Sequence, residues 1–203
     1  MRREIAAGRK AARMKVVAVN GSARKKGNTS LLISAAFEPL VEAGISCELI
    51  ELAGRNIRGC TACGKCTTKA DGKCWGRRDD GNDIIERMGA ADAIILGSPV
   101  YFADVTSEIK AIMDRAGYVG RAKREMFMRK PGAAIVAVRR AGGMHAFDTL
   151  NHFFSIAEMI TVGSSYWNIG IGRGRGDVEG DAEGMTTMRR LGENMAWVLE
   201  RLG

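Results

Sequence analysis

The sequence predicts an α/β fold, a doubly wound parallel sheet of five strands in the order 2-1-3-4-5 with helices on both faces. Three observations predict it. Short apolar runs alternate with longer amphipathic patterns, as in a parallel sheet joined by helices. The units number five, whereas the alternative, a Rossmann sheet of six strands, needs one strand more. With 203 residues, 46% of them hydrophobic, the chain can bury one sizeable core.

The first part of the chain predicts a strand, a helix and a second strand. Residues 14–22, "MKVVAVNGS", form a valine-rich run that ends at glycine, which is typical of a buried parallel strand. A helix is expected over 28–44, stopping at Gly44, and Pro39 should kink or divide it. The apolar run at 45–52 predicts the second strand.

In the middle of the chain, a short helix at 82–92 precedes the third strand, which lies within "DAIILGSPVYF" at 92–102. The helix that follows has a clear period of about 3.6 residues, so one of its faces should pack on the sheet. Its apolar positions are Val105, Ile109, Ile112, Met113 and Ala116.

The last part of the chain predicts two more strands, at 132–140 and 159–167. A helix with an apolar stripe from Met144 to Ala157 separates them, and a second stripe from Met188 to Leu202 marks the closing helix. Before that helix, the Gly-rich stretch 170–184 is expected to be a mobile loop.

Charge and composition limit the functional classes that this chain can belong to. Much of the net charge of +8 lies in a basic arm, residues 1–13, which we expect to precede the folded domain at 14–203 as a solvated tail. No zinc-finger or RNA-binding signature supports a nucleic-acid partner. No apolar run is long enough for a bilayer, and the start of the chain lacks the apolar stretch of a secretory signal. We therefore expect a cytoplasmic protein that keeps its thiols reduced.

The loop after the first strand, "NGSARKKGNTS" at 20–30, offers a phosphate site. It is neither a Walker loop nor the G-x-G-x-x-G pattern of dinucleotide sites. Unpaired N–H groups and the positive end of the helix dipole suit a terminal phosphate, and a capped helix without ligand is the alternative. The polar donors there are Ser22, Arg24, Asn28, Thr29 and Ser30.

Two more loops should emerge on the same rim of the sheet. "GSPVYF" at 97–102 has a stiffening Pro99 and the flat side chains of Tyr101 and Phe102, and "RRAGG" at 139–143 combines two cations with two glycines. Core packing of the aromatic residues and a tight glycine turn are the simpler interpretations. Together the three loops suit a mononucleotide with a broad ring, for which FMN is the natural candidate.

Four of the five cysteines lie in a basic loop that spans 58–80. Cys60, Cys63 and Cys66 have the spacing C-x2-C-x2-C, and Cys74 follows seven residues after Cys66. Such a run can wrap a [4Fe–4S] cluster, whereas structural zinc usually takes two separated C-x2-C pairs and disulfides fit poorly with a reduced cell. Cysteines without a metal remain the other interpretation, and Cys47 in the second strand is interpreted as a core residue.

Over residues 14–203, the sequence resembles the NADPH-dependent FMN reductase and iron–sulfur flavoprotein group of flavodoxin-like proteins. Two stretches carry this resemblance, "NGSARKKGNTS" and "LGSPVYFADVTSEIKAIMDR". The resemblance implies a flavodoxin-like fold and a homo-oligomer, a homodimer or homotetramer, in which the cluster of one subunit approaches the flavin of another. It implies three sets of site residues. Those that hold the FMN phosphate are Ser22, Arg24, Asn28, Thr29 and Ser30. Those around the flavin ring are Pro99, Val100, Tyr101, Phe102, Ala141, Gly142 and Gly143. The [4Fe–4S] ligands are Cys60, Cys63, Cys66 and Cys74.

Three functional hypotheses follow. In the first, an FMN-binding iron–sulfur flavoprotein takes electrons from ferredoxin or a similar carrier and passes them to a small acceptor such as a quinone, oxygen or peroxide. The second is an NAD(P)H-dependent FMN or quinone reductase without a functional cluster. The third is a non-enzymatic zinc- or redox-sensing binding module that uses the basic arm. No catalytic residue is assigned, because His145 and His152 lack an evident third ligand or carboxylate partner and the sequence has no paired carboxylates.

Overall fold

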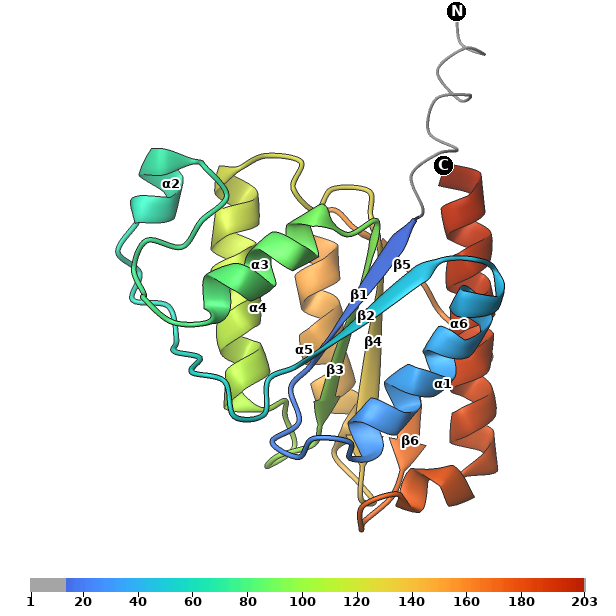
Figure 1. Cartoon of the computed structure of the whole chain (residues 1–203). Coiled ribbons are helices and arrows are strands. Elements are labelled where there is room, and N and C mark those ends of the chain that lie inside the picture. The colour runs from blue at the N-terminus through green and yellow to red at the C-terminus, as the bar shows by residue number, and fades with distance from the viewer. Residues whose placement is uncertain (1–13, 203) are drawn as a thin grey trace, which may run out of the picture.

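The computed structural model describes residues 14–202 and confirms the doubly wound parallel sheet (Figure 1). Its main path has the order β2-β1-β3-β4-β5, and every pair along it is parallel. The strands are β1 (Lys15–Asn20), β2 (Ser46–Glu51), β3 (Ala93–Pro99), β4 (Pro131–Val138) and β5 (Ile160–Thr161), with β6 (Ile169–Ile171) also paired to β4. The basic arm expected at 1–13 lies outside the described residues.

Helices cover the two faces of the sheet (Figure 1). On one face lie α1 (Asn28–Glu42) and α6 (Ala182–Leu202); on the other lie α3 (Gly81–Ala90), α4 (Ser107–Ala122) and α5 (Gly143–Ile156). Each face has its own apolar cluster. Because both faces are covered, every residue of β4 is buried, which explains why its sequence is continuously apolar.

The structure differs from the sequence prediction at one helix and one loop. α1 is not divided at Pro39, which lies in the last turn of a helix that continues to Glu42. The stretch 170–184 contains β6, a 3-10 turn at Asp177–Gly180 and the start of α6. This stretch is tied down because the Asp177 carboxylate accepts hydrogen bonds from the backbone N–H groups of Arg173 and Gly174.

The fifth strand differs from the predicted run at 159–167. β5 pairs only with Pro131 and Gly132 at the start of β4, and β6 pairs with its end at 136–138. Between them the chain leaves the sheet in a turn in which the Ser164 hydroxyl donates to the Tyr166 carbonyl. It returns at Asn168, whose side chain donates to the carbonyl of Ala134. Two short strands therefore share one edge position.

Within residues 14–202, no helix is long and apolar enough to cross a membrane. Outside the two helical layers, α2 (Lys65–Lys69) stands beside α4, at the far left of Figure 1. It belongs to the loop that carries the four clustered cysteines.

The contact of α1 with α6 depends on Gly192. A Cβ atom at Gly192 would lie only 2.2 Å from the carbonyl oxygen of Ala36, which is backbone and cannot swing aside. We therefore expect Gly192→Ala to lower the free energy of unfolding by about 1–3 kcal/mol, even though alanine favours helix. Urea unfolding measures this change.

The control is Gly163→Ala, since a Cβ there meets nothing within 4 Å. Its stability should match that of the parent chain. Equal stability of Gly192→Ala and the parent would contradict the close approach of the two helices.

Candidate functional site

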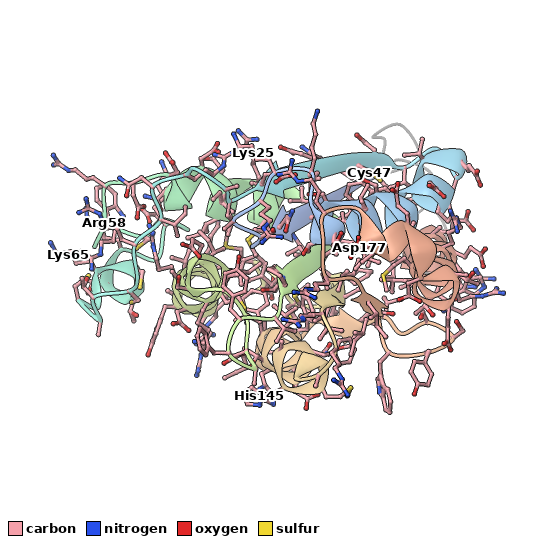
Figure 2. The ribbon with its side chains drawn as sticks, turned by 90° about the horizontal axis from the view of Figure 1, so that it is seen from below. Lys25, Cys47, Arg58, Lys65, His145 and Asp177 are labelled. Carbon is pink, nitrogen blue, oxygen red and sulfur yellow. The ribbon has the colours of Figure 1, made fainter. Side chains whose placement is uncertain are left out.

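The loops after β1, β3 and β4 meet at the carboxyl edge of the sheet, as predicted. The strand register pairs Asn20 at the end of β1 with Glu51 of β2 and Gly97 of β3, so these strands end at one level. Figure 2 looks onto this edge. Around it lie Lys25 in the loop after β1, His145 in the first turn of α5 and Asp177 in the 3-10 turn before α6. Arg58 and Lys65 mark the cysteine loop at the left.

A buried polar network shapes the loop after β1. The Asn20 side chain donates to the Ser30 hydroxyl (2.9 Å) and accepts from the Ser22 backbone N–H (2.9 Å). The Ser30 hydroxyl in turn donates to Glu51 Oε1 (2.7 Å), which also accepts from the Lys26 N–H. Ser30 is thus occupied within the network, so its side chain shapes the loop rather than facing a ligand.

The first turn of α1 fits an anionic group. Its N-cap residue is Gly27, which offers no capping side chain, so the first N–H groups of the helix lack that partner. Thr29 in this turn is only 1% exposed, and its hydroxyl oxygen has no hydrogen-bond partner. A phosphate at this terminus would satisfy such donors and the helix dipole together.

Two other predicted phosphate residues lie differently. The Asn28 side chain is engaged on both sides, because its amide donates to the Gly174 carbonyl and its oxygen accepts from the Gly176 N–H, both at 2.8 Å. Asn28 therefore connects α1 to the loop before α6. Arg24 is exposed, and its backbone N–H donates to the Ser22 hydroxyl.

The loop after β3 presents an aromatic side chain from a tight turn. Tyr101 and Asp104 exchange two backbone hydrogen bonds across Phe102 and Ala103, which both have positive φ (49° and 66°). Non-glycine residues seldom adopt this backbone, and such strain gathers at functional sites. The Phe102 side chain is fully exposed and Tyr101 is exposed as well, so neither is the core residue that the simpler interpretation suggested.

The loop after β4 packs against this turn. Gly142 has φ 82° and lies so close to the turn that a Cβ atom there would come 3.2 Å from Ala103 Cα and 3.4 Å from Val100 Cγ1. Gly143, which is buried, begins α5, and Ala141 is exposed beside it. His145 in the first turn of α5 lies 3.7 Å from the Asp104 carboxylate.

Hydrogen bonds connect the rim into one rigid surface. The Thr106 hydroxyl donates to the Gly21 carbonyl (2.7 Å), and the Gly21 N–H donates to the Gly97 carbonyl (2.8 Å). Pro99 and Val100, which end and follow β3, are half-buried beneath the turn. The predicted FMN residues are therefore brought together on one rim, with Asn28 and Ser30 in supporting positions.

The four clustered cysteines surround one cavity of about 140 Å³. Cys60 and Cys63 are exposed, Cys66 is half-buried and Cys74 is buried, and none of them forms a disulfide. In residues 14–202, no three His, Cys, Asp or Glu side chains lie close enough to hold a metal ion. Four thiols around one cavity can serve as the ligands of a multi-iron cluster.

The loop wraps the cavity through strained backbone. Ala62 and Ala70 have positive φ (51° and 47°), and the Ala62 N–H donates to Cys60 Sγ at 3.3 Å. Hydrogen bonds from the Lys65 backbone N–H and the Thr61 hydroxyl lower the pKa of Cys63. A lowered thiol pKa favours the thiolate, which is the form that binds metal.

Side chains outside the cysteine motif hold the loop in place. Arg115 of α4 makes a bidentate ion pair with Asp79, at 2.8 and 2.9 Å, and both side chains are fully buried. The Asn82 side chain of α3 accepts from the Cys74 N–H and donates to the Cys74 carbonyl. Burial opposes ionisation of Asp79, but hydrogen bonds from Arg115 and from the Gly81 and Arg58 N–H groups outweigh it and lower its pKa.

Our sequence reasoning missed Glu51, Asp79, Asn82 and Arg115. One signal was available for Arg115, because it lies three residues after Ile112 and four before Val119, on the apolar stripe of its helix. A charge on a buried stripe demands a partner. Nothing in the local sequence identified Asp79 as that partner. As predicted, Cys47 packs against the core.

The cavity and the rim lie at different places along α4. The helix begins at Ser107, just after the β3 turn, whereas Arg115 and Val119 line the cysteine cavity. They follow Ser107 by eight and twelve residues, which is about 12 and 18 Å along the axis. Figure 1 shows α2 near the end of α4 that is far from the rim.

Comparisons with known proteins agree with this geometry. The family model of NADPH-dependent FMN reductases matches residues 14–174. An iron-sulfur flavoprotein of Methanocaldococcus jannaschii is 38% identical over 92% of this chain and 98% of its own length. One of Methanosarcina thermophila is 32% identical over 92% of this chain and 96% of its own length.

Solved structures share the fold. The WrbA-like flavodoxin from Agrobacterium tumefaciens superposes with a TM-score of 0.65 at 15% identity, covering 94% of this chain and 99% of that one. RosB gives a TM-score of 0.72 at 18% identity, covering 93% of this chain and 80% of that one.

The Asp79–Arg115 pair should make stability depend on pH. A carboxylate with a lowered folded pKa stabilises the fold above its unfolded pKa, about 3.9, and this stability is lost as pH falls through the folded value. At pH 7, Asp79→Asn should cost about 3–5 kcal/mol, because Arg115 is left buried and unpaired. The difference should shrink below about pH 4.

Urea unfolding of both proteins at a series of pH values measures this effect. Asp83→Asn is the control, since Asp83 is an exposed partner of Arg87 on the surface of α3 and its loss should change stability little. A difference between Asp79→Asn and the parent that is constant from pH 7 to pH 3 would contradict the role given to the buried pair.

Proposed function

This chain belongs to the NADPH-dependent FMN reductase family and is an FMN-dependent oxidoreductase, and on that premise we propose that it is an iron–sulfur flavoprotein. In this proposal FMN binds at the rim of the sheet and a [4Fe–4S] cluster binds at Cys60, Cys63, Cys66 and Cys74. The protein passes electrons between a one-electron carrier such as ferredoxin and a small acceptor such as a quinone, oxygen or peroxide.

One observation carries the proposal of a cluster: the four cysteines of the motif line a single cavity. Four thiolates around a shared space are the usual ligands of a [4Fe–4S] cluster. Two relatives that match nearly the full chain bear the name iron-sulfur flavoprotein, which supports the same assignment.

For the FMN phosphate, we assign the N–H groups of the first turn of α1 and the hydroxyl of Thr29, with Arg24 exposed in the same loop. The unpartnered, buried Thr29 hydroxyl supports this assignment. Asn28, Ser30 and Ser22 act indirectly, because the side chains of Asn28 and Ser30 are engaged by the surrounding loops and the Ser22 hydroxyl by the Arg24 backbone. Each holds the phosphate loop in shape.

For the flavin ring, we assign the rim formed by the loops after β3 and β4. Phe102 and Tyr101 offer exposed aromatic surface, and the close contact of Gly142 with Val100 and Ala103 closes one side. The remaining members of this set are Pro99, Ala141 and Gly143. When bound, FMN exchanges one or two electrons and a [4Fe–4S] cluster exchanges one. Together the two groups would allow electrons to pass between a one-electron carrier and a two-electron acceptor.

The cysteine loop also suits an acidic electron donor. Between Arg58 and Arg78 the sequence has six basic residues and one acid, Asp71. Of these cations, Lys69 lies over the ring of Trp75, 3.5 Å from its centroid, and Arg77 donates to the Gly59 carbonyl. The exposed remainder gives the loop a positive surface that would steer an anionic carrier such as ferredoxin.

A homo-oligomer, a homodimer or homotetramer, is part of the proposal. The cavity lies about 12–18 Å along α4 from the rim, a separation that favours contact between the cluster of one subunit and the flavin of another. A second subunit could bring its rim to the cavity. We also propose a cytoplasmic location, because thiolate ligands of a cluster stay reduced in a reducing compartment.

The second candidate is an NAD(P)H-dependent FMN or quinone reductase without a functional cluster. The family model that matches the chain favours it, since the family is named for NADPH-dependent reduction. The exposed ring of Phe102 offers a flat surface for a nicotinamide or a quinone. In that case the cysteines serve no electron transfer.

We expect Thr29→Val to weaken FMN binding by about 10- to 100-fold, because a hydrogen bond to a charged phosphate is worth about 1.5–3 kcal/mol. Fluorescence titration of the flavin-free protein with FMN measures the dissociation constant. The control is Thr186→Val on α6, where the hydroxyl only bonds the Ala182 carbonyl. Unchanged affinity of Thr29→Val would refute the phosphate assignment.

Serine variants of the cysteines separate the two candidates. Purified without oxygen, Cys60→Ser, Cys63→Ser, Cys66→Ser and Cys74→Ser should each lose most of their iron, because one of four thiolate ligands is replaced. FMN content should not change. Cys47→Ser is the control and should keep both, since Cys47 packs against the core.

The same proteins are then reduced with a one-electron donor and with NADPH, and the bleaching of the flavin is followed. Slower reduction by the one-electron donor, confined to the four motif variants, supports the proposed function. A parent chain that contains FMN but no iron, and is reduced rapidly by NADPH, establishes the second candidate instead.

A further inference from the structure

Arg115 is an unusual residue in the core of this protein. It is 1% exposed, and it is the largest of the fully buried side chains. The space for its guanidinium exists because residue 81 is glycine, where a Cβ atom would lie 2.4 Å from Arg115 Nη1. A buried cation normally requires a full set of partners.

The partners of Arg115 come from both ends of the cysteine loop. Its two terminal nitrogens bind the Asp79 carboxylate, and Nη1 also donates to the carbonyl of Arg58 (3.1 Å). The remaining nitrogen, Nε, donates to Cys74 Sγ at 3.4 Å. One side chain therefore joins the start of the loop, its end and its most buried cysteine to α4.

We propose that Arg115 is a positioning residue that sets the reduction potential of the cluster through Cys74. The inference rests on the proposed function, in which Cys74 is a ligand. The Nε–H group lies against the ligand sulfur, and the positive charge is shielded from water. Hydrogen bonds to ligand sulfurs and nearby charge are two of the factors that determine cluster potentials.

The direction of the effect follows from the charges. Reduction transfers one electron from the donor to the cluster; the donor is oxidised by one electron, and Arg115 neither gains nor loses a proton. The reduced cluster carries one more negative charge than the oxidised cluster. Because Arg115 stabilises the more negative form more strongly, it raises the midpoint potential.

The test uses a paired substitution, because Arg115→Gln alone would leave Asp79 buried without a cation. In Asp79→Asn/Arg115→Gln, two neutral side chains that can hydrogen-bond replace the ion pair. Loss of the negative charge of Asp79 would by itself move the potential upward, so a downward shift is attributable to Arg115. Arg121→Gln is the control, because Arg121 is an exposed arginine on the same helix.

Iron, acid-labile sulfide and FMN are measured on anaerobically purified proteins, and the cluster potential is measured by a redox titration followed by electron paramagnetic resonance. We expect the double variant to shift downward by about a tenfold change in the reduction equilibrium, which is about 59 mV for one electron. The control should match the parent. An unchanged potential in an iron-containing double variant would overturn the inference.

Two further outcomes are informative. The double variant could be folded but lack iron. In that case the rate at which iodoacetamide alkylates Cys74 is compared between the iron-free variant and the iron-free parent. A rate at least about tenfold above that of the parent supports the positioning role, and an equal rate overturns it. If the parent chain itself lacks iron, the proposed function fails, and that failure is seen before any variant is compared.

Discussion

The cysteine loop depends most on one interaction, the buried ion pair between Asp79 and Arg115. The apolar contacts of the loop are few, since Cys74 is its buried member and Cys66 and Ile57 pack only partly against the core. Breaking a buried pair costs about 3–5 kcal/mol, a large part of the stability of a typical domain. The pair joins both ends of the loop, because Asp79 accepts from the Arg58 N–H and Arg115 donates to the Arg58 carbonyl.

A second constraint shapes the rim of the sheet. Parallel strands that end at one level bring three loops together, and the links from Thr106 to Gly21 and from Gly21 to Gly97 keep those loops in fixed positions. On this rigid frame the structure keeps features that are unfavourable without a ligand, namely the unpartnered Thr29 hydroxyl and the left-handed backbone at Phe102. The frame thus explains why such features persist together at one place. α4 begins beside this rim, and its residues Arg115 and Val119 line the cysteine cavity.

The sequence predicted the sheet order and the helices well, because buried parallel strands and amphipathic helices have strong periodic signals. The prediction was less successful where tertiary contacts determine the local structure. The strand predicted at 159–167 is split because Asn168 bonds to β4, and the stretch 170–184 is ordered because Asn28 and Asp177 tie it down. The cysteine motif was evident from its spacing. Its support by Arg115, 41 residues after Cys74, was not, since no local pattern connects the two.

The most direct test of the central claim is one anaerobic preparation of the parent chain, on which the absorption spectrum, FMN, iron and acid-labile sulfide are all measured. A chain that binds both groups should show flavin bands over a broad shoulder that dithionite bleaches, with about four irons and four sulfides for each FMN. Flavin bands without iron would contradict the pairing of FMN with a cluster. The protein would then be a flavin reductase whose cysteine cavity has another role.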